Sequence, residues 1–128
     1  MNDPFATFCG VEIVEARPGY AQTRLVLDGK HRNAVDLTHG GALFTLGAAA
    51  FFAACNAAGP TAVGINLSIA FLRPVADGIL VAEATETARS RRIAHCEVSI
   101  MDESGQLVAR LTGTAAIREP RAFPAGLS

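Results

Sequence analysis

The residues from Ala42 to Cys55 form an almost unbroken run of apolar and small side chains, and this run limits what the chain can fold into. The run is shorter than the ~20 residues that cross a bilayer, and Thr45 and Gly47 interrupt it, so a buried helix is expected here. Because this helix is apolar on nearly every side, other elements of the chain must wrap around it.

Both ends of the expected helix carry termination signals. Thr38 is the expected N-cap, since its hydroxyl can accept a hydrogen bond from a backbone N–H of the first turn. Gly59 followed by Pro60 is expected to supply the C-cap and to stop the helix.

The rest of the chain favours strands, because apolar and polar residues alternate with a period of two. In residues 61–74 we expect one face to carry Val63, Ile65, Leu67, Ile69 and Phe71. Other strands are expected at 11–16, 20–27, 79–88, 93–101 and 107–117, with turns at Pro18-Gly19 and at 102–105.

These elements predict an α+β fold in which an antiparallel sheet of five or six strands wraps around one long buried helix. At 128 residues the chain is expected to be a single domain, 1–128, with an irregular tail at 119–128.

Composition excludes several classes of protein. The net charge is −1, so nothing global attracts the chain to nucleic acid or to an anionic membrane. Cys9, Cys55 and Cys96 are odd in number and lack C-x-x-C spacing, which disfavours a disulfide framework and a zinc site, and no metal is expected. The start of the chain lacks the pattern of a signal peptide, so we expect a cytoplasmic protein.

The segment just before the helix combines residues suited to chemistry: Asn33, His39, Gly40 and Gly41. The pattern N-x5-H-G-G-A-L-F-T-L, followed by A-C-N and S-I-A-F-L-R-P, resembles the PaaI-like acyl-CoA thioesterases of phenylacetate degradation. The likeness covers residues 10–118. It implies the hotdog fold, in which a sheet wraps a central helix.

The resemblance also implies a mechanism in which a coenzyme A thioester binds where two subunits meet. The N-terminus of the helix would polarise the thioester carbonyl, with the Gly41 N–H as principal donor and Gly40 beside coenzyme A. Asn33 would orient the carbonyl or the attacking water, and His39 would hold the loop and the leaving sulfur. From the residues alone, each position also has an ordinary structural role. Asn33 can be a turn residue, the glycine pair can form a tight helix entry, and His39 can be a cap. No separate cofactor is implied, since coenzyme A is part of the substrate.

The sequence departs from this family at one position of the helix. The family usually has an aspartate in a Leu-Ala-Asp tripeptide as nucleophile or general base, and this chain has Ala48 there. Thr45, one turn earlier, carries the nearest hydroxyl on that face. A helical threonine ordinarily donates this hydroxyl proton to the backbone carbonyl four residues earlier. Asp36 is the nearest acid in sequence and would either activate water or complement the helix dipole.

Arginine clusters in the second half of the chain. The resemblance assigns Arg89, Arg91 and Arg92, with Arg73, to the phosphates of coenzyme A, although arginines at a turn are also ordinary surface residues. His95 and Glu97 share one strand face, which is expected to be solvated.

Two function hypotheses therefore remain: an acyl-CoA thioesterase with a relocated base, and an acyl-CoA-binding module that has lost hydrolysis. In both, the family implies a homodimer that pairs again into a tetramer, and the apolar composition fits this assembly.

Overall fold

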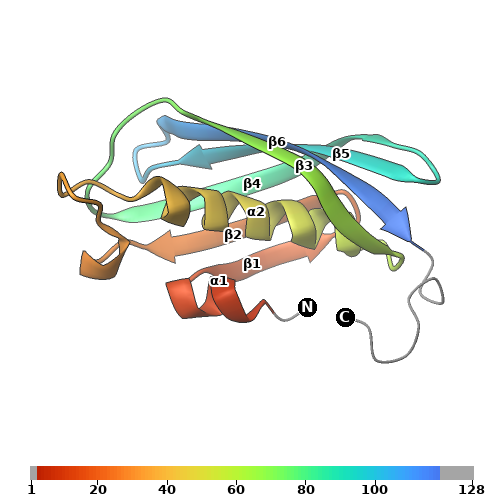
Figure 1. Ribbon diagram of the computed structural model, residues 1–128, viewed down its shortest axis with the longest axis horizontal. Helices are drawn as coiled ribbons and strands as arrows, with labels where there is room; N and C mark the ends of the chain where they lie inside the picture. The colour runs from red at the N-terminus through yellow and green to blue at the C-terminus, as the bar shows by residue number, and fades with distance from the viewer. Residues whose placement is uncertain (1–2, 119–128) are drawn as a thin grey trace.

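A six-stranded antiparallel sheet curls around one long helix, α2 (Gly40–Asn56), in the computed structural model, which describes residues 3–118. Figure 1 shows α2 packed on the concave face of the sheet and running in the same general direction as β2 and β4. The predicted α+β architecture and the order of its major elements are confirmed. The expected tail at 119–128 lies outside the described residues. The strands are β1 (Glu12–Arg17), β2 (Tyr20–Val26), β3 (Thr61–Phe71), β4 (Ile79–Arg89), β5 (Ile93–Met101) and β6 (Leu107–Arg118).

The strands follow the spatial order β1-β2-β4-β5-β6-β3. Strands β4, β5 and β6 form the expected meander, and the turn between β5 and β6 is the one predicted at 102–105. After α2, the chain enters the sheet at its far edge, where β3 pairs with β6 alone. The sheet therefore has two edge strands, β1 and β3.

Two short helices were not predicted: α1 (Pro4–Cys9) and the 3-10 helix η1 (Gly29–His31). The Asp3 carboxylate caps α1 by accepting the Ala6 N–H at 3.0 Å. Gly10 ends α1 with a φ of 94°, a conformation that favours glycine. An N-cap Asp, a Pro at the first helical position and a closing Gly are all readable in the sequence, so this helix could have been predicted.

The core lies between α2 and the sheet. Phe51 on α2 is fully buried over β6, where a Cβ on Gly113 would lie only 2.6 Å from the Phe51 ring. Glycine is therefore required in the strand for this ring to pack. On the other side of the helix, the buried Thr23 hydroxyl donates to the Leu46 carbonyl at 2.9 Å and ties β2 to α2. These contacts fix how α2 is rotated against the sheet.

A β-bulge changes which side chains of β3 face the core, compared with the prediction. The register with β6 shifts between Gly64 and Asn66, which leaves Ile65 as the extra residue. Leu67 packs against the core, whereas Val63 and Ile65 are 45% and 60% exposed. The expected single apolar face was wrong because the bulge reverses the side-chain alternation on its N-terminal side.

The end of α2 lies earlier than predicted. The helix ends at Asn56 with Ala57 as C-cap, and Gly59 follows two residues later with a φ of 114°. Asn56 bridges to the start of β3 because its side chain both accepts the Ala62 N–H at 2.8 Å and donates to the Ala62 carbonyl at 3.1 Å. Gly59 therefore turns the chain after the helix rather than capping it. Across residues 3–118, no helix has both the length and the apolar character that a membrane span requires.

Candidate active site

The N-terminus of α2 begins at His39 and not at the expected Thr38. His39 is the N-cap, and its Nδ1 atom accepts the Gly41 N–H at 2.8 Å. Thr38 is held in an extended conformation, since its N–H donates to the Val75 carbonyl at 2.9 Å and it forms a bridge with Arg32. The predicted cap was wrong because the helix begins one residue later: the His39 ring accepts the Gly41 N–H, and the buried Thr38 hydroxyl has no hydrogen-bond partner within residues 3–118.

His39 also satisfies the next amide groups of α2. Its carbonyl accepts the N–H groups of Ala42 at 2.9 Å and Leu43 at 3.3 Å. Since Gly41 is bonded to the His39 ring, Gly40 has the one N–H of this first turn that forms no hydrogen bond within residues 3–118. The N-terminus of a helix attracts negative charge through such unpaired donors.

Asn33 holds the loop that leads into α2. Its Oδ1 atom accepts the N–H groups of Val35 and Leu37, each at 3.0 Å, and its own N–H donates to the Leu37 carbonyl at 2.7 Å. Two of these bonds use the side-chain oxygen and the third uses the backbone N–H, whereas the side-chain NH2 group takes no part in them. The geometry therefore makes Asn33 a turn residue, and its side-chain NH2 group remains available as a donor.

Asp36 points away from the helix. Its φ of 64° places it in the left-handed region at the tip of the loop, and its side chain is 83% exposed. The carboxylate pairs with Arg32, with 3.2 Å between Oδ1 and Nη1. In this conformation Asp36 neither caps α2 nor lies over its N-terminus.

One face of α2 carries Gly41, Thr45, Ala48 and Phe52, as the helical spacing predicts. Thr45 donates its hydroxyl proton to the Gly41 carbonyl at 2.7 Å, which is the ordinary back-bond of a helical threonine. Ala48 is 9% exposed. This face therefore carries no carboxylate.

Two clefts flank the start of α2. The first, here called the Phe71 cleft, is a cavity of about 380 Å³ lined by Asn33, Gly40, Phe71 and Arg73 among others. The Phe71 ring packs directly over Gly40, where a Cβ would lie 2.9 Å from the ring. A side chain at position 40 would thus press on the tip of the Phe71 ring, which is 56% exposed and would have to turn aside.

The second cleft, here called the Lys30 cleft, has a volume of about 420 Å³. His39, Gly41 and Thr45 line it, together with Lys30 and the buried His31. The structure therefore divides the predicted residues between two neighbouring clefts: Asn33, Gly40 and Arg73 on one side, and His39, Gly41 and Thr45 on the other.

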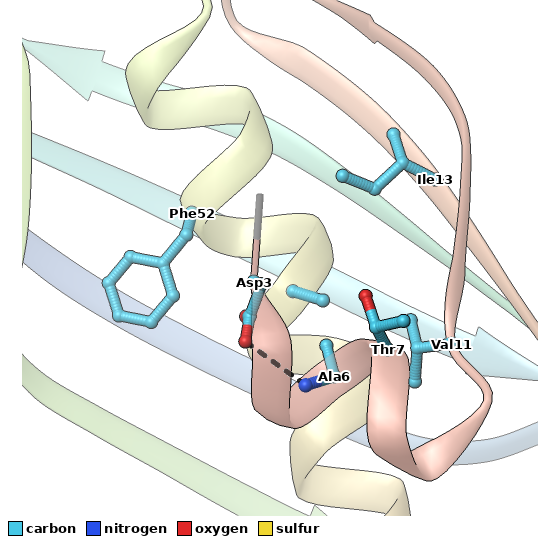
Figure 2. Close-up of a pocket in the computed structure, with 7 residues that line it drawn as sticks. Asp3, Ala6, Thr7, Val11, Ile13 and Phe52 are labelled. Carbon is cyan, nitrogen blue, oxygen red and sulfur yellow. Dashed lines mark hydrogen bonds between the residues drawn. The ribbon is translucent and has the colours of Figure 1, made fainter. Parts of the chain in front are cut away.

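A third pocket lies farther along α2, where α1 packs against it, and has a volume of about 250 Å³ (Figure 2). Ala49 and Phe52 of α2 line this pocket, whereas Ala53 lines a different one. Asp3 and Thr7 of the α1 segment supply the polar atoms of this pocket. Sequence reasoning missed these two residues because α1 itself was missed.

The arginines lie at opposite ends of the molecule. Arg73 lines the Phe71 cleft at the start of α2, whereas Arg89 donates to the Cys55 carbonyl at 3.5 Å near the helix end. The two ends of α2 are separated by about 24 Å along the helix axis. Arg91 and Arg92 line a separate, open pocket at the end of β6. Within one chain, Arg73 and residues 89–92 therefore do not meet.

His95 and Glu97 face outward from the sheet, away from α2. His95 hydrogen-bonds through Nδ1 to the Thr114 hydroxyl at 2.9 Å, and Glu97 pairs with Arg110 at 3.5 Å. The alternate residues Cys96 and Val98 are fully buried against the helix. The outer face is thus separate from the clefts at the start of α2.

Comparison with known proteins places the chain in a family. The model of the thioesterase superfamily matches residues 36–109, which is more than half of the chain. The acyl-coenzyme A thioesterase PaaI of Escherichia coli is 31% identical over 113 residues, which cover 88% of this chain and 81% of that protein.

Two solved structures extend this comparison. A mutant of the phenylacetic acid degradation protein PaaI from Thermus thermophilus is 35% identical, with a TM-score of 0.85 over 91% of this chain and 99% of that one. A "hypothetical thioesterase protein with coenzyme A" from Streptococcus pneumoniae has a TM-score of 0.80 over 85% of this chain and 86% of that one, but at 24% identity it shows the fold alone. The chain therefore belongs to the thioesterase superfamily, as a PaaI-like member with the hotdog fold.

Proposed function

We propose that this chain is an acyl-CoA thioesterase that hydrolyses its substrate slowly, because alanine stands at the helix position where the family usually has a carboxylate. The observation that carries this proposal is the Gly40 N–H at the start of α2, which has no hydrogen-bond partner within residues 3–118, in a residue that lines the Phe71 cleft. Both PaaI relatives share about a third of their residues with this chain, which supports the same substrate class.

The first step is polarisation of the thioester carbonyl by the start of α2. A carbonyl oxygen that accepts the Gly40 N–H gains both a hydrogen bond and the positive end of the helix dipole. Gly41 was expected to be the principal donor, yet its N–H already bonds to the His39 ring at 2.8 Å. We therefore assign the first donor role to Gly40, with Gly41 available only when the ring turns away.

Asn33 and Arg73 supply further polar groups in the same cleft. The free NH2 group of Asn33 can donate to the carbonyl or to an attacking water, while its oxygen keeps the loop in place. Arg73 lies where a phosphate or the polar arm of coenzyme A can pair with its guanidinium. Apolar side chains that line the cleft, including Phe71, can contact the acyl group.

The complete site needs a second copy of the chain. Within one chain, Arg89 contacts the Cys55 carbonyl near the end of α2 that is far from Gly40, and we infer that Arg89, Arg91 and Arg92 approach the same coenzyme A from a second subunit. Strand β3 is an edge strand of 11 residues whose outer side has no partner within residues 3–118. Such an edge is able to pair with a second copy. We propose a homodimer joined along β3, with a dimer of dimers as its further assembly.

Activation of water is the weak step. Ala48 offers no base, Thr45 already donates its proton to Gly41, and the Asp36 carboxylate points into solvent. A positioned general base typically contributes about 10²–10⁴-fold to such a step. Hydrolysis without one relies on carbonyl polarisation and orientation, and so we expect a low kcat.

The alternative function is an acyl-CoA-binding module without turnover. It is favoured by the same face of α2, on which Gly41, Thr45, Ala48 and Phe52 provide no titratable group. Both functions use the same cleft and differ only in whether the thioester bond breaks.

Two measurements on a panel of aryl, short-chain and medium-chain acyl-CoA thioesters separate the thioesterase from the binding module. One is the release of free thiol, and the other is binding followed by calorimetry. Slow release above the buffer rate supports the thioesterase. Saturable binding with release at the buffer rate supports the binding module, and no binding at all contradicts both.

A further inference from the structure

Two buried thiols meet where the end of α2 packs on the sheet, far from the candidate active site. The Sγ atoms of Cys55 and Cys96 lie 3.3 Å apart, and both residues are fully buried. Cys55 belongs to the last turn of α2, and Cys96 lies in the middle of β5. The remaining cysteine, Cys9, is half-buried in α1 and is not in contact with them.

Charged groups border this thiol pair on one side. Glu86 on β4 lies directly across from Cys96 in the sheet, and its carboxylate is within 4.8 Å of both sulfur atoms. Arg89 donates to Glu86 at 2.8 Å and also to the Cys55 carbonyl at 3.5 Å. Because the guanidinium already neutralises this carboxylate, a metal cation would have to compete with it. The geometry therefore favours chemistry between the two thiols.

The two thiols are not equivalent. The hydrogen bond between them lowers the pKa of the Cys55 thiol, in opposition to burial, which raises it. The same bond, together with burial, raises the pKa of the Cys96 thiol. The lowered pKa makes Cys55 the thiol that ionises first, although by geometry either sulfur can donate the hydrogen bond, and a thiolate is the form that reacts with oxidants.

We propose that Cys55 and Cys96 form a reversible intramolecular disulfide when the folded protein meets a small peroxide. The Cys55 thiolate attacks one peroxide oxygen, the O–O bond breaks, and Cys55 becomes a sulfenic acid as water leaves. The Cys96 sulfur then attacks the Cys55 sulfur, the S–O bond breaks and a second water leaves. Overall, two thiols and one hydrogen peroxide give one disulfide and two waters.

The position of Cys55 in the chain determines how an oxidant reaches the thiol pair and which elements the disulfide would link. It precedes the final helical residue Asn56, and helix ends open more readily than helix centres, so a water-sized oxidant can enter there. The bond would link residues 41 positions apart and fasten the last turn of α2 to β5. We expect the oxidised protein to melt several degrees higher than the reduced one, and dithiothreitol to reverse this shift.

The test uses the full chain, fully reduced and then treated with one equivalent of hydrogen peroxide. The protein is alkylated under denaturing conditions, and its intact mass and its proteolytic peptides are measured. We expect a mass loss of two hydrogens, one alkylated thiol per chain instead of three, and a peptide with residue 55 linked to one with residue 96. Three alkylated thiols, or a link that involves Cys9, would overturn the proposal.

Variants assign the roles of the two sulfurs. Cys9→Ser is the matched control and should form the same link. Cys96→Ala should trap a sulfenic acid at position 55 that a dione probe labels, and Cys55→Ala should not label at position 96; the reverse pattern would contradict the assigned order. Circular dichroism checks that each variant folds, and the peptide map of the unmodified chain does not depend on them. None of these readouts requires thioesterase activity, so they stand independently of the proposed function.

Discussion

The Nδ1 atom of His39 accepts the Gly41 N–H at 2.8 Å, so the residue expected to hold the leaving sulfur is also the cap of α2. With Nδ1 as acceptor, the ring proton lies on Nε2, which is able to donate to a ligand in the Lys30 cleft. The capping role of His39 is observed, whereas a contact between its ring and the substrate sulfur stays a prediction, and substitutions can separate the two.

His39→Ala should lower the free energy of unfolding by about 1 kcal/mol, because the helix loses its cap. His39→Asn should recover most of this stability, since asparagine is a good N-cap. Thermal denaturation and thiol release are measured on both variants. If the ring also holds the sulfur, the asparagine variant stays less active than the unmodified chain; full recovery of activity would mean that His39 only caps the helix.

Asn33→Ala should destabilise the chain by about 1–2 kcal/mol, because the Val35 and Leu37 N–H groups lose their acceptor. Asn33→Asp keeps the acceptor oxygen but removes the NH2 donor, so it should fold with nearly normal stability. Urea unfolding and thiol release are compared for the two variants. An aspartate variant with unchanged activity would show that the NH2 group does not contact the substrate.

Ile65→Lys should separate the subunits, because a charge at the bulge of β3 disfavours pairing along this edge. Val14 on β1 provides the matched control, since it lies at the bulge of the other edge strand and is 54% exposed. Light scattering should give a smaller mass for Ile65→Lys and an unchanged mass for Val14→Lys. The opposite pattern would place the subunit contact on β1.

Asp102 should make stability depend on pH at the turn between β5 and β6. Hydrogen bonds from the Ser104 hydroxyl and from the Gln106 N–H lower the pKa of its carboxyl below the ordinary value of 3.8. A lowered pKa in the folded state means that the contribution is complete above pH 3.8 and is lost as the pH falls through the folded-state pKa. Unfolding by urea at a series of pH values should show a smaller loss on acidification for Asp102→Asn than for the unmodified chain, and equal losses would refute this.

Much of the fold could be predicted because two periodicities dominate the sequence. The apolar run of α2 and the alternation of the strands indicated the elements and most of their bounds, since burial alone explains them. The alternation could not reveal the bulge at Ile65, because a single unpaired residue depends on the register with β6. Thr38 likewise has the residue type of a cap, yet the helix begins one residue later with His39 as its cap.

The candidate site was predictable in its residues but not in its geometry. The sequence indicated Asn33, His39 and the glycine pair, yet it could not show that Gly41 is bonded to His39 while Gly40 is free. Nor could spacing rules find the pair of Cys55 and Cys96, since the two come from a helix and a strand 41 positions apart. Such contacts exist only once the chain has folded.

The most direct test of slow hydrolysis compares the unmodified chain with Ala48→Asp and Ala48→Asn in the release of free thiol from acyl-CoA thioesters. The asparagine variant controls for size and polarity without adding a base. We predict slow release by the unmodified chain, an increase of at least about tenfold for Ala48→Asp, and no increase for Ala48→Asn. Release at the buffer rate by the unmodified chain, despite saturable binding of the thioester, would contradict the proposed activity and leave an acyl-CoA-binding protein.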